Sequence, residues 1–324
     1  MVADNLTQAR GPLNMSIDAH IDIPWVMSKE GAFDLNTNNA GEKSKTDFMR
    51  MHIGGLNGAF FALYLSDNMQ DTKGKEWCRK ELGHQISRIK TQTGCELVGT
   101  RHEARMAALS GLTPIFLGLE GGRLIGEDLN FLNELRGSNV RYLTVTHNKN
   151  TSWADSATDT PKVHGLGRFG MKVVKKCNEL GIYLDVSHAS DATARAIVWV
   201  SDKPVIASHS GCKKIKDHER NLTDELIKDI ARTGGVVCIP FVKKFIGEHY
   251  FNVSRHIDHA VQLVGPNHVG IGSDLDGADL CNGVNSVADW KRVVMEELSS
   301  MGYGDELIAR IAGENILRLM DDKE

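Results

Sequence analysis

The amino-acid sequence predicts an α/β protein and, within that class, a single (β/α)8 barrel of the TIM type. Short apolar runs rich in β-branched residues alternate along the chain with amphipathic stretches of helical period. Eight such runs fall within 324 residues, a length that suits eight strands with interleaved helices. A doubly wound parallel sheet has the same alternation, so periodicity alone leaves that fold open as the alternative.

Each predicted strand is a short apolar run, and most of these runs end in polar residues. In chain order, the predicted strands span residues 16–22, 59–66, 114–120, 140–147, 182–188, 204–209, 235–240 and 268–274. Strands that alternate with helical stretches in this way are typical of a parallel sheet.

Amphipathic stretches of helical period fill most of the intervals between the strands. The predicted helices span residues 75–91, 130–137, 169–180, 191–200, 223–232 and 253–264, and two more follow the last strand, at 287–301 and 305–320. No low-complexity segment, charge block or Pro/Ser-rich linker divides the chain. We therefore expect residues 1–324 to form one domain.

Composition and charge are those of an ordinary globular protein. Hydrophobic residues make up 41% of the chain and charged residues 25%, which excludes a disordered or collagenous chain. The 38 Lys and Arg residues nearly balance the 42 Asp and Glu residues, for a net charge of -4. Nucleic acids and anionic membranes bind proteins with clustered positive charge, so we expect neither as a partner.

The two ends of the chain and its apolar stretches predict a cytoplasmic protein. Residues 1–14 are polar and have no basic segment leading into an apolar run, so no signal peptide is expected. The most apolar stretches fall far short of the ~20 residues that a membrane-spanning helix requires. The charged tail at 320–324 does not fit a lipid-anchor signal.

Imidazoles and carboxylates stand at the ends of six predicted strands. The C-terminal strand ends of a barrel meet at one rim, where active sites are built, so we expect these groups to lie together. In chain order they are His20, Asp22, Glu120, His147, His188, His209 and Asp274.

Five of these residues predict a metal site with two ions. His20 and Asp22 are two apart on a strand and point to the same side, so they could reach one ion. His188 and His209 end successive strands, which lie ~4.8 Å apart, and Glu120 could bridge two ions. Three imidazoles and two carboxylates exceed what one tetrahedral zinc takes. Zinc is the expected metal, and manganese, cobalt or iron would also fit such ligands.

Longer sequence blocks surround these residues and resemble a known family. They are Asp-Ala-His-Ile-Asp-Ile-Pro-Trp (18–25), Gly-Leu-Glu-Gly (118–121), Tyr-Leu-Thr-Val-Thr-His-Asn (142–148), Leu-Asp-Val-Ser-His-Ala-Ser (184–190), Ala-Ser-His-Ser (207–210), Arg-Asn-Leu-Thr-Asp (220–224) and Gly-Ile-Gly-Ser-Asp-Leu-Asp-Gly (270–277). In this collinear order, over nearly the whole chain, the sequence resembles the membrane (renal) dipeptidase family of zinc peptidases.

The resemblance implies a barrel of the amidohydrolase type with two zinc ions at the strand ends. In that reading, His20 and Asp22 bind one zinc, His188 and His209 bind the other, and Glu120 bridges them. The resemblance also allows a homodimer, because many relatives pair in this way.

The catalytic and substrate-binding roles that the resemblance implies concern three further residues. His147 corresponds to a histidine that steadies the oxyanion, Asp274 to the catalytic acid/base, and Arg220 to an arginine that holds the substrate. Tyr64, at the end of the second predicted strand, is a candidate pocket residue, with a core or rim position as the alternative. Lys149 stands where we expect a family cysteine.

The function implied is the hydrolysis of dipeptides, with a C-terminal residue of L or D configuration, by a water that two metal ions activate. One alternative is another hydrolase on the same dinuclear site that cleaves N-acyl-D-amino acids or lactams. A metal-dependent phosphotriesterase would also fit the ligand pattern. A catalytically silent barrel retained for binding is the alternative from another class.

Overall fold

The computed structural model describes residues 14–30, 33–37 and 44–321. Residues 1–13 and 322–324 lie outside this part of the chain, and with them most of the polar N-terminal segment and of the charged tail. Within the described residues, no helix combines the length and the apolar character that crossing a membrane requires.

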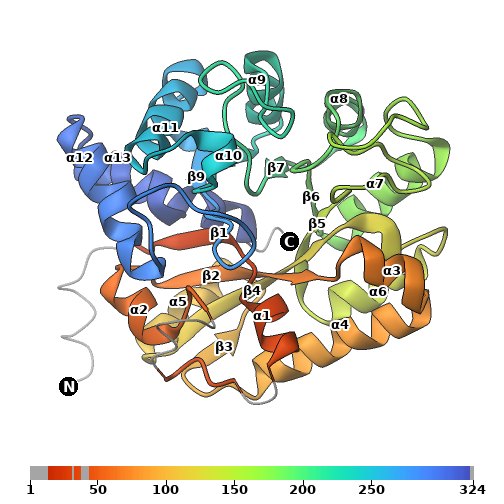
Figure 1. Cartoon of the computed structure of the whole chain (residues 1–324), viewed down its shortest axis with the longest axis horizontal. Helices are drawn as coiled ribbons and strands as arrows, with labels where there is room; N and C mark the ends of the chain where they lie inside the picture. Colours follow the sequence, from red (N-terminus) through yellow and green to blue (C-terminus); the bar gives the residue numbers. More distant parts are fainter. Residues whose placement is uncertain (1–13, 31–32, 38–43, 322–324) are drawn as a thin grey trace, which may run out of the picture.

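Eight parallel strands form the centre of the molecule, one at each predicted position (Figure 1). They are β1 (Ile17–Ile21), β2 (Gly58–Tyr64), β4 (Thr113–Glu120), β5 (Val140–Thr144), β6 (Tyr183–Asp185), β7 (Val205–Ala207), β8 (Val236–Ile239) and β9 (Val269–Ile271). A ninth strand, β3 (Cys95–Leu97), pairs with β4 outside this order. Strand β3 was not predicted, because Glu96 interrupts its short apolar run.

The last strand returns to the first and nearly closes the sheet into a barrel. Ile21 and Leu275 form a parallel bridge, in which Asp22 N donates to Leu275 O at 2.8 Å. One residue earlier, Asp274 N donates to His20 O at 3.0 Å. A doubly wound sheet is open at both edges, so this closure excludes that alternative and confirms the predicted barrel.

Helices surround the strands and follow one another around the barrel (Figure 1). Those that the periodicity predicted are α4 (Lys75–Lys90), α6 (Asn130–Gly137), α7 (Arg168–Leu180), α8 (Asp191–Val200), α9 (Asp224–Arg232) and α11 (Phe251–Val264). Their observed ends agree with the predicted ones to within two residues.

Five helices were not predicted, and most of them are too short to show a period. They are α1 (Ile23–Lys29), α2 (Phe48–Ile53), α3 (Asp67–Lys73), α5 (Arg101–Leu109) and α10 (Lys243–Ile246). The start of α5 did carry a signal, a capping box in which Thr100 and Glu103 satisfy each other's main-chain N–H groups.

The two helices predicted after the last strand are interrupted. The first divides into the 3-10 helix Val287–Asp289, the π-helical turn Arg292–Glu296 and α12 (Glu297–Ser300). The second divides into α13 (Asp305–Ala309), a π-helical turn Arg310–Glu314, α14 (Asn315–Leu317) and a final 3-10 turn Arg318–Met320. At Gly313 the chain touches β1, and a Cβ there would lie 2.1 Å from Met15 O. This close approach explains why the helix does not continue through Gly313.

A buried carboxylate on β1 reinforces the closure of the barrel. Asp18 Oδ1 accepts hydrogen bonds from His20 N at 3.0 Å and from Ser273 N at 2.9 Å, and its Oδ2 accepts from Trp290 Nε1 at 2.9 Å. Burial raises the pKa of Asp18 to about 6, although these hydrogen bonds oppose the rise. The first strand, the last strand and the segment after it therefore meet at one side chain.

Replacing Trp290 by Phe should destabilise the protein, because the donor to Asp18 is lost and the smaller ring leaves part of a buried space unfilled. We expect the free energy of unfolding to fall by about 1–3 kcal/mol, the usual cost of leaving a buried polar group without its partner. Urea unfolding checks this. Trp199→Phe is the matched control, since Trp199 is 89% exposed. Equal stability of the two variants would contradict the role of the Trp290 hydrogen bond.

Candidate active site

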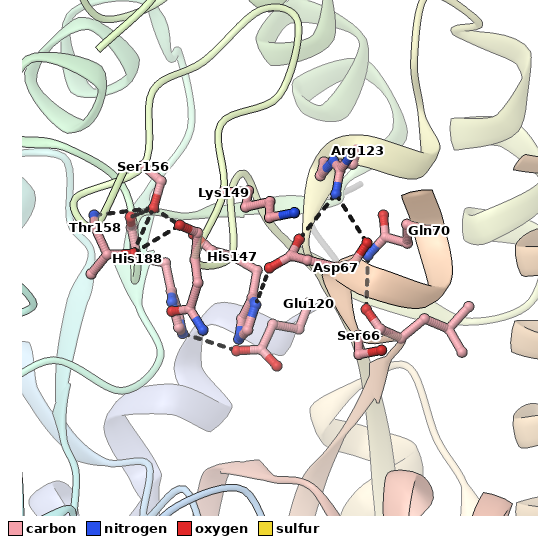
Figure 2. A network of polar contacts seen from close by, with 12 residues as sticks. Ser66, Asp67, Gln70, Glu120, Arg123, His147, Lys149, Ser156, Thr158 and His188 are labelled. Carbon is pink, nitrogen blue, oxygen red and sulfur yellow. Dashed lines mark hydrogen bonds and ion pairs between the residues drawn. The ribbon is translucent and has the colours of Figure 1, made fainter. Parts of the chain in front are cut away.

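The strand ends bring three imidazoles around the carboxylate of Glu120, the last residue of β4. Glu120 Oε1 lies 3.1 Å from His188 Nε2, 3.5 Å from His209 Nε2 and 3.6 Å from His20 Nε2 (Figure 2 shows the contact with His188). His188 and His209 follow β6 and β7, and His20 lies on β1. All four side chains are buried.

Asp22 and Asp274 extend this cluster on the side of β1 and β9. Asp22 Oδ2 is 3.4 Å from His20 Nε2, and the ligand atoms of His20, Asp22 and Asp274 lie within 4.8 Å of one another. The strand ends at Ile21, however, and Asp22 caps the start of α1. The alternation of side chains along a strand therefore does not account for the direction of Asp22, and the turn into α1 does.

Two of the clustered residues have unusual backbone conformations. His188 and Asp274 have φ values of 66° and 61°, in the left-handed region that few residues other than glycine adopt. Such conformations persist only where the surroundings enforce them, and they concentrate at functional sites. Here they mark the sharp turns by which the chain leaves β6 and β9.

The hydrogen bonds of His20 and His209 determine which ring nitrogen of each carries the proton. His20 Nδ1 is 2.8 Å from the hydroxyl of Tyr142, which itself donates to a main-chain carbonyl. His209 Nδ1 is 2.7 Å from Ser208 Oγ, which donates to Asp185 Oδ2 at 2.6 Å. Each hydroxyl thus accepts from Nδ1–H, so the lone pair of each imidazole is on Nε2. Both Nε2 atoms are buried and have no hydrogen-bond partner among the described residues.

The buried carboxyl groups of the cluster favour the binding of cations. Burial raises the pKa of Glu120 to about 7 and raises those of Asp22 and Asp274 as well, and the neighbouring Asp22 raises the pKa of Asp274 further. Arg220 is a buried cation that interacts electrostatically with Asp274 and Glu120. Buried charges are stable only when they are paired, so the excess of carboxylates favours divalent cations here.

The imidazoles are in the form that binds metals. Burial, reinforced by the neighbouring cationic groups, holds the pKa of His188 and of His209 well below its ordinary value, so both rings are neutral. His20, Asp22, Glu120, His188 and His209 together offer nitrogen and oxygen atoms that suit zinc, manganese, cobalt or iron. The donor types present therefore fit divalent metal ions. Three groups of described residues have ligand atoms within 4.8 Å of one another: His20, Glu120 and His209; Glu120, His147 and His188; and His20, Asp22 and Asp274.

His147 and Tyr64 lie beside the cluster. The His147 ring centroid is 4.5 Å from that of His188 and 4.7 Å from that of Tyr64, the last residue of β2. Ser156 Oγ lies 2.6 Å from His147 O and 3.3 Å from His188 O, so it ties the two histidine loops together (Figure 2). Tyr64 is half-buried at the site, at the rim and not in the barrel core.

Arg220 occupies a loop after β7 and is buried, although it was chosen from sequence only by resemblance. Burial lowers its pKa to about 10, against the opposing effects of Asp274 and Glu120. Its Nε and Nη2 atoms have no hydrogen-bond partner among the described residues, and its guanidinium carbon lies 5.1 Å from the Phe245 ring centroid. Arg220 and Phe245 line a pocket of about 640 Å³ formed by the loops after β5, β7, β8 and β9.

Asn221 fixes the loop that carries Arg220. Its Oδ1 accepts from Gly211 N at 3.0 Å, and its Nδ2 donates to Lys216 O and to Phe245 O, both at 2.8 Å. These contacts anchor the loop to the chain after β7 and to α10.

Sequence reasoning missed the residues that support the cluster. Tyr142 and Ser208 lie within the quoted sequence blocks but were not singled out, because nothing in a single sequence shows which ring nitrogen they contact. Asp67 follows β2 by three residues, and its side chain lies 3.1 Å from His147 Nδ1. Extending the strand-end search by a few residues beyond each strand would have found it.

Comparisons with known proteins agree with this geometry. Residues 13–324 match the model of the family described as membrane dipeptidase (peptidase family M19). Dipeptidase verJ of Clonostachys rogersoniana is 30% identical over 347 residues, which cover 100% of this chain and 88% of the relative.

Solved structures of relatives share the fold. A metallopeptidase from Rhodobacter sphaeroides, liganded with a phosphinate mimic of the dipeptide L-Ala-D-Ala, has a TM-score of 0.85 and 25% identity over 94% of this chain and 98% of its own. Dipeptidase AC, a metallopeptidase of family M19, has a TM-score of 0.86 and 24% identity over 95% and 98% of the two chains. The probable dipeptidase PvdM of Pseudomonas aeruginosa has a TM-score of 0.85 and 23% identity over 98% and 96%.

Removing the Ser208 hydroxyl should weaken metal binding, since His209 would lose the partner that keeps its Nε2 free. For Ser208→Ala we expect a loss of about 10- to 100-fold in zinc affinity, measured by competition with a chelating dye. Ser210→Ala is the control, because Ser210 Oγ contacts Ser187 Oγ and no imidazole. The same affinity in both variants would rule out this effect of Ser208.

Proposed function

The chain belongs to the membrane dipeptidase family, peptidase family M19, and is a metallopeptidase that hydrolyses peptide bonds; we propose that its substrates are dipeptides with a free C-terminal carboxylate and a C-terminal residue of L or D configuration. The observation that carries the proposal is the unpaired guanidinium of Arg220 at the same rim as the Glu120 cluster. The phosphinate mimic of L-Ala-D-Ala bound by the Rhodobacter relative supports the D configuration.

Five residues would hold two divalent ions, zinc in the first place. His20 and Asp22 would hold one ion, His188 and His209 would hold the other, and Glu120 would be a ligand of both. Its central position, within 3.6 Å of all three imidazoles, supports the bridging role. Ions held in this way lower the pKa of a water molecule towards ~7 and polarise the scissile carbonyl.

The other residues of the site bind the substrate and move protons. Arg220 pairs through its planar fork with the substrate carboxylate, which sets the length of peptide that fits. His147, with a proton on each ring nitrogen, donates a hydrogen bond from Nε2 to the developing oxyanion, a contact whose removal typically costs ~10²–10³ in turnover. Asp274 accepts the proton of the attacking water and delivers it to the leaving amine.

A substrate panel tests the proposal directly. The panel contains L-Ala-L-Ala, L-Ala-D-Ala, the amidated dipeptide and N-acetyl-D-alanine, each assayed with and without a chelator after the bound metal has been quantified. We expect turnover of both free dipeptides, lost with the chelator and restored by zinc. Hydrolysis of N-acetyl-D-alanine in preference to the dipeptides would favour the alternative amidohydrolase. No turnover after metal loading would favour a binding protein.

Asp274→Asn should abolish catalysis while the metals stay bound, because the amide can neither accept nor deliver the proton. We expect turnover of L-Ala-D-Ala to fall by about 10²–10⁴. Metal content, measured on the same preparation, should equal that of the wild type. Substantial remaining turnover would refute the proton-transfer role of Asp274.

Arg220→Ala should lower kcat/KM for free dipeptides by about 10- to 150-fold, the value of a hydrogen-bonded charge pair. The amidated dipeptide has no carboxylate to pair, so its kcat/KM should change little. Lys244→Ala is the control, since Lys244 is an exposed cation that lines the same pocket. An equal loss for free and amidated substrates would contradict the pairing.

A further inference from the structure

His147 is connected to the surface of the barrel by a chain of charged side chains (Figure 2). Asp67, the first residue of α3, accepts a hydrogen bond from His147 Nδ1 onto Oδ2 at 3.1 Å. The side chains of His147 and Asp67 are only 13% and 12% exposed. This contact joins the loop after β5 to the loop after β2, across 80 residues of sequence.

The carboxylate of Asp67 is itself held on its other side. Arg123 Nη1 donates to Asp67 Oδ1 at 3.3 Å and to Asp67 O at 3.4 Å, and Arg123 also contacts Asp71. Asp71 Oδ2 in turn accepts from Lys149 Nζ at 2.6 Å. Arg123 lies in the 3-10 turn Gly122–Leu124, which follows Glu120 closely.

These contacts close a ring. Lys149 is two residues after His147, so the path from His147 through Asp67, Arg123 and Asp71 returns to the segment from which it started. The ring links the loops that follow β2, β4 and β5. Exposed ion pairs contribute little singly, so the buried contact between His147 and Asp67 carries the argument.

We propose that Asp67 is a positioning residue that holds the His147 imidazole with Nδ1 towards α3 and Nε2 towards Glu120 and His188, and that Arg123 holds Asp67 in place. The two ring nitrogens lie on opposite sides of the imidazole, so fixing Nδ1 also fixes the direction of Nε2 (Figure 2). The catalytic consequence rests on the proposed function, in which His147 Nε2 meets the oxyanion.

Asp67 can orient the His147 ring because a carboxylate can only accept a hydrogen bond. It therefore retains the proton on Nδ1 and disfavours the flipped ring, in which Cδ2 takes the place of Nδ1 and Cε1 takes the place of Nε2. The neighbouring rings of Tyr64 and His188 pack against the imidazole but do not distinguish its nitrogens. Asp67 makes that distinction.

A merely structural role for Asp67 is the competing explanation, because an acidic residue in the first turn of α3 also stabilises the helix. A double-mutant cycle separates the two. Asp67→Asn keeps the shape of the side chain and removes its charge, and it is measured alone and together with His147→Ala.

For Asp67→Asn in the zinc-loaded enzyme, we expect kcat for L-Ala-D-Ala to fall by about 10- to 100-fold, with KM nearly unchanged. In the His147→Ala background the same substitution should cost less than about twofold, because Asp67 acts through the ring that is missing. An equal loss in both backgrounds, or no loss in either, overturns the proposal.

A measurement that does not depend on turnover accompanies the cycle. In spectra of protein labelled with ¹⁵N-histidine, the His147 signals are those absent from His147→Ala. We expect the wild type to show a hydrogen-bonded Nδ1–H for His147 and Asp67→Asn to lose this signature. Its persistence in Asp67→Asn would overturn the proposal even if the protein hydrolysed no dipeptide, whereas inactivity of the wild type alone would count against the proposed function.

Asp128→Asn is the matched control for both measurements. Asp128 forms an ion pair of 2.8 Å with Arg79 and makes no contact with His147. We expect it to leave kcat and the His147 spectrum unchanged. A change in Asp128→Asn equal to that in Asp67→Asn would mean that any lost ion pair at this rim perturbs His147, which would overturn the specific role of Asp67.

Discussion

The arrangement of the site depends on burying the carboxylate of Glu120 among three imidazoles. Asp22 and Asp274 are buried beside it, and burial raises the pKa of all three carboxyl groups because it disfavours their charged forms. Such a cluster is stable when cations join it, and its neutral imidazoles present lone pairs for that purpose. The packing of the barrel keeps these carboxyl groups close together although their negative charges repel one another.

The groups that orient the cluster also hold the barrel together. Asp18 accepts hydrogen bonds from the main chain of both His20 and Ser273, so the side chain that joins the first and last strands also fixes the base of the site. Asp185 does the same between β6 and β7, since it binds Ser208 through both the main chain and the hydroxyl. Stability and function therefore share the same hydrogen bonds.

The loops beyond the strand ends supply Arg220 and Asp67, which complete the site. The loop after β7 is anchored by Asn221 and carries Arg220, whose Nε and Nη2 have no hydrogen-bond partner in the described part of the chain. The loop after β2 supplies Asp67 to the histidine that follows β5. The contact between Asp67 and His147 joins the loops after β2 and β5, which are not neighbours in the strand order. Substrate selection and the orientation of His147 therefore depend on loop packing, whereas the central carboxylate and its imidazoles depend on the strands.

The sequence by itself determined the eight strands of the barrel, most of the longer helices and the collection of polar groups at one rim. These follow from local periodicity and from the rule that parallel strands end at the same edge, so His20, Glu120, His188 and His209 could be placed together. Only the tertiary structure decided that Asp22 points inward from a helix start, that Tyr142 and Ser208 set the imidazole protons, and that Asp67 meets His147. Those contacts join residues far apart in the sequence, and local periodicity carries no information about such pairs. The path of the loops and the closure of β9 onto β1 bring them within hydrogen-bonding distance.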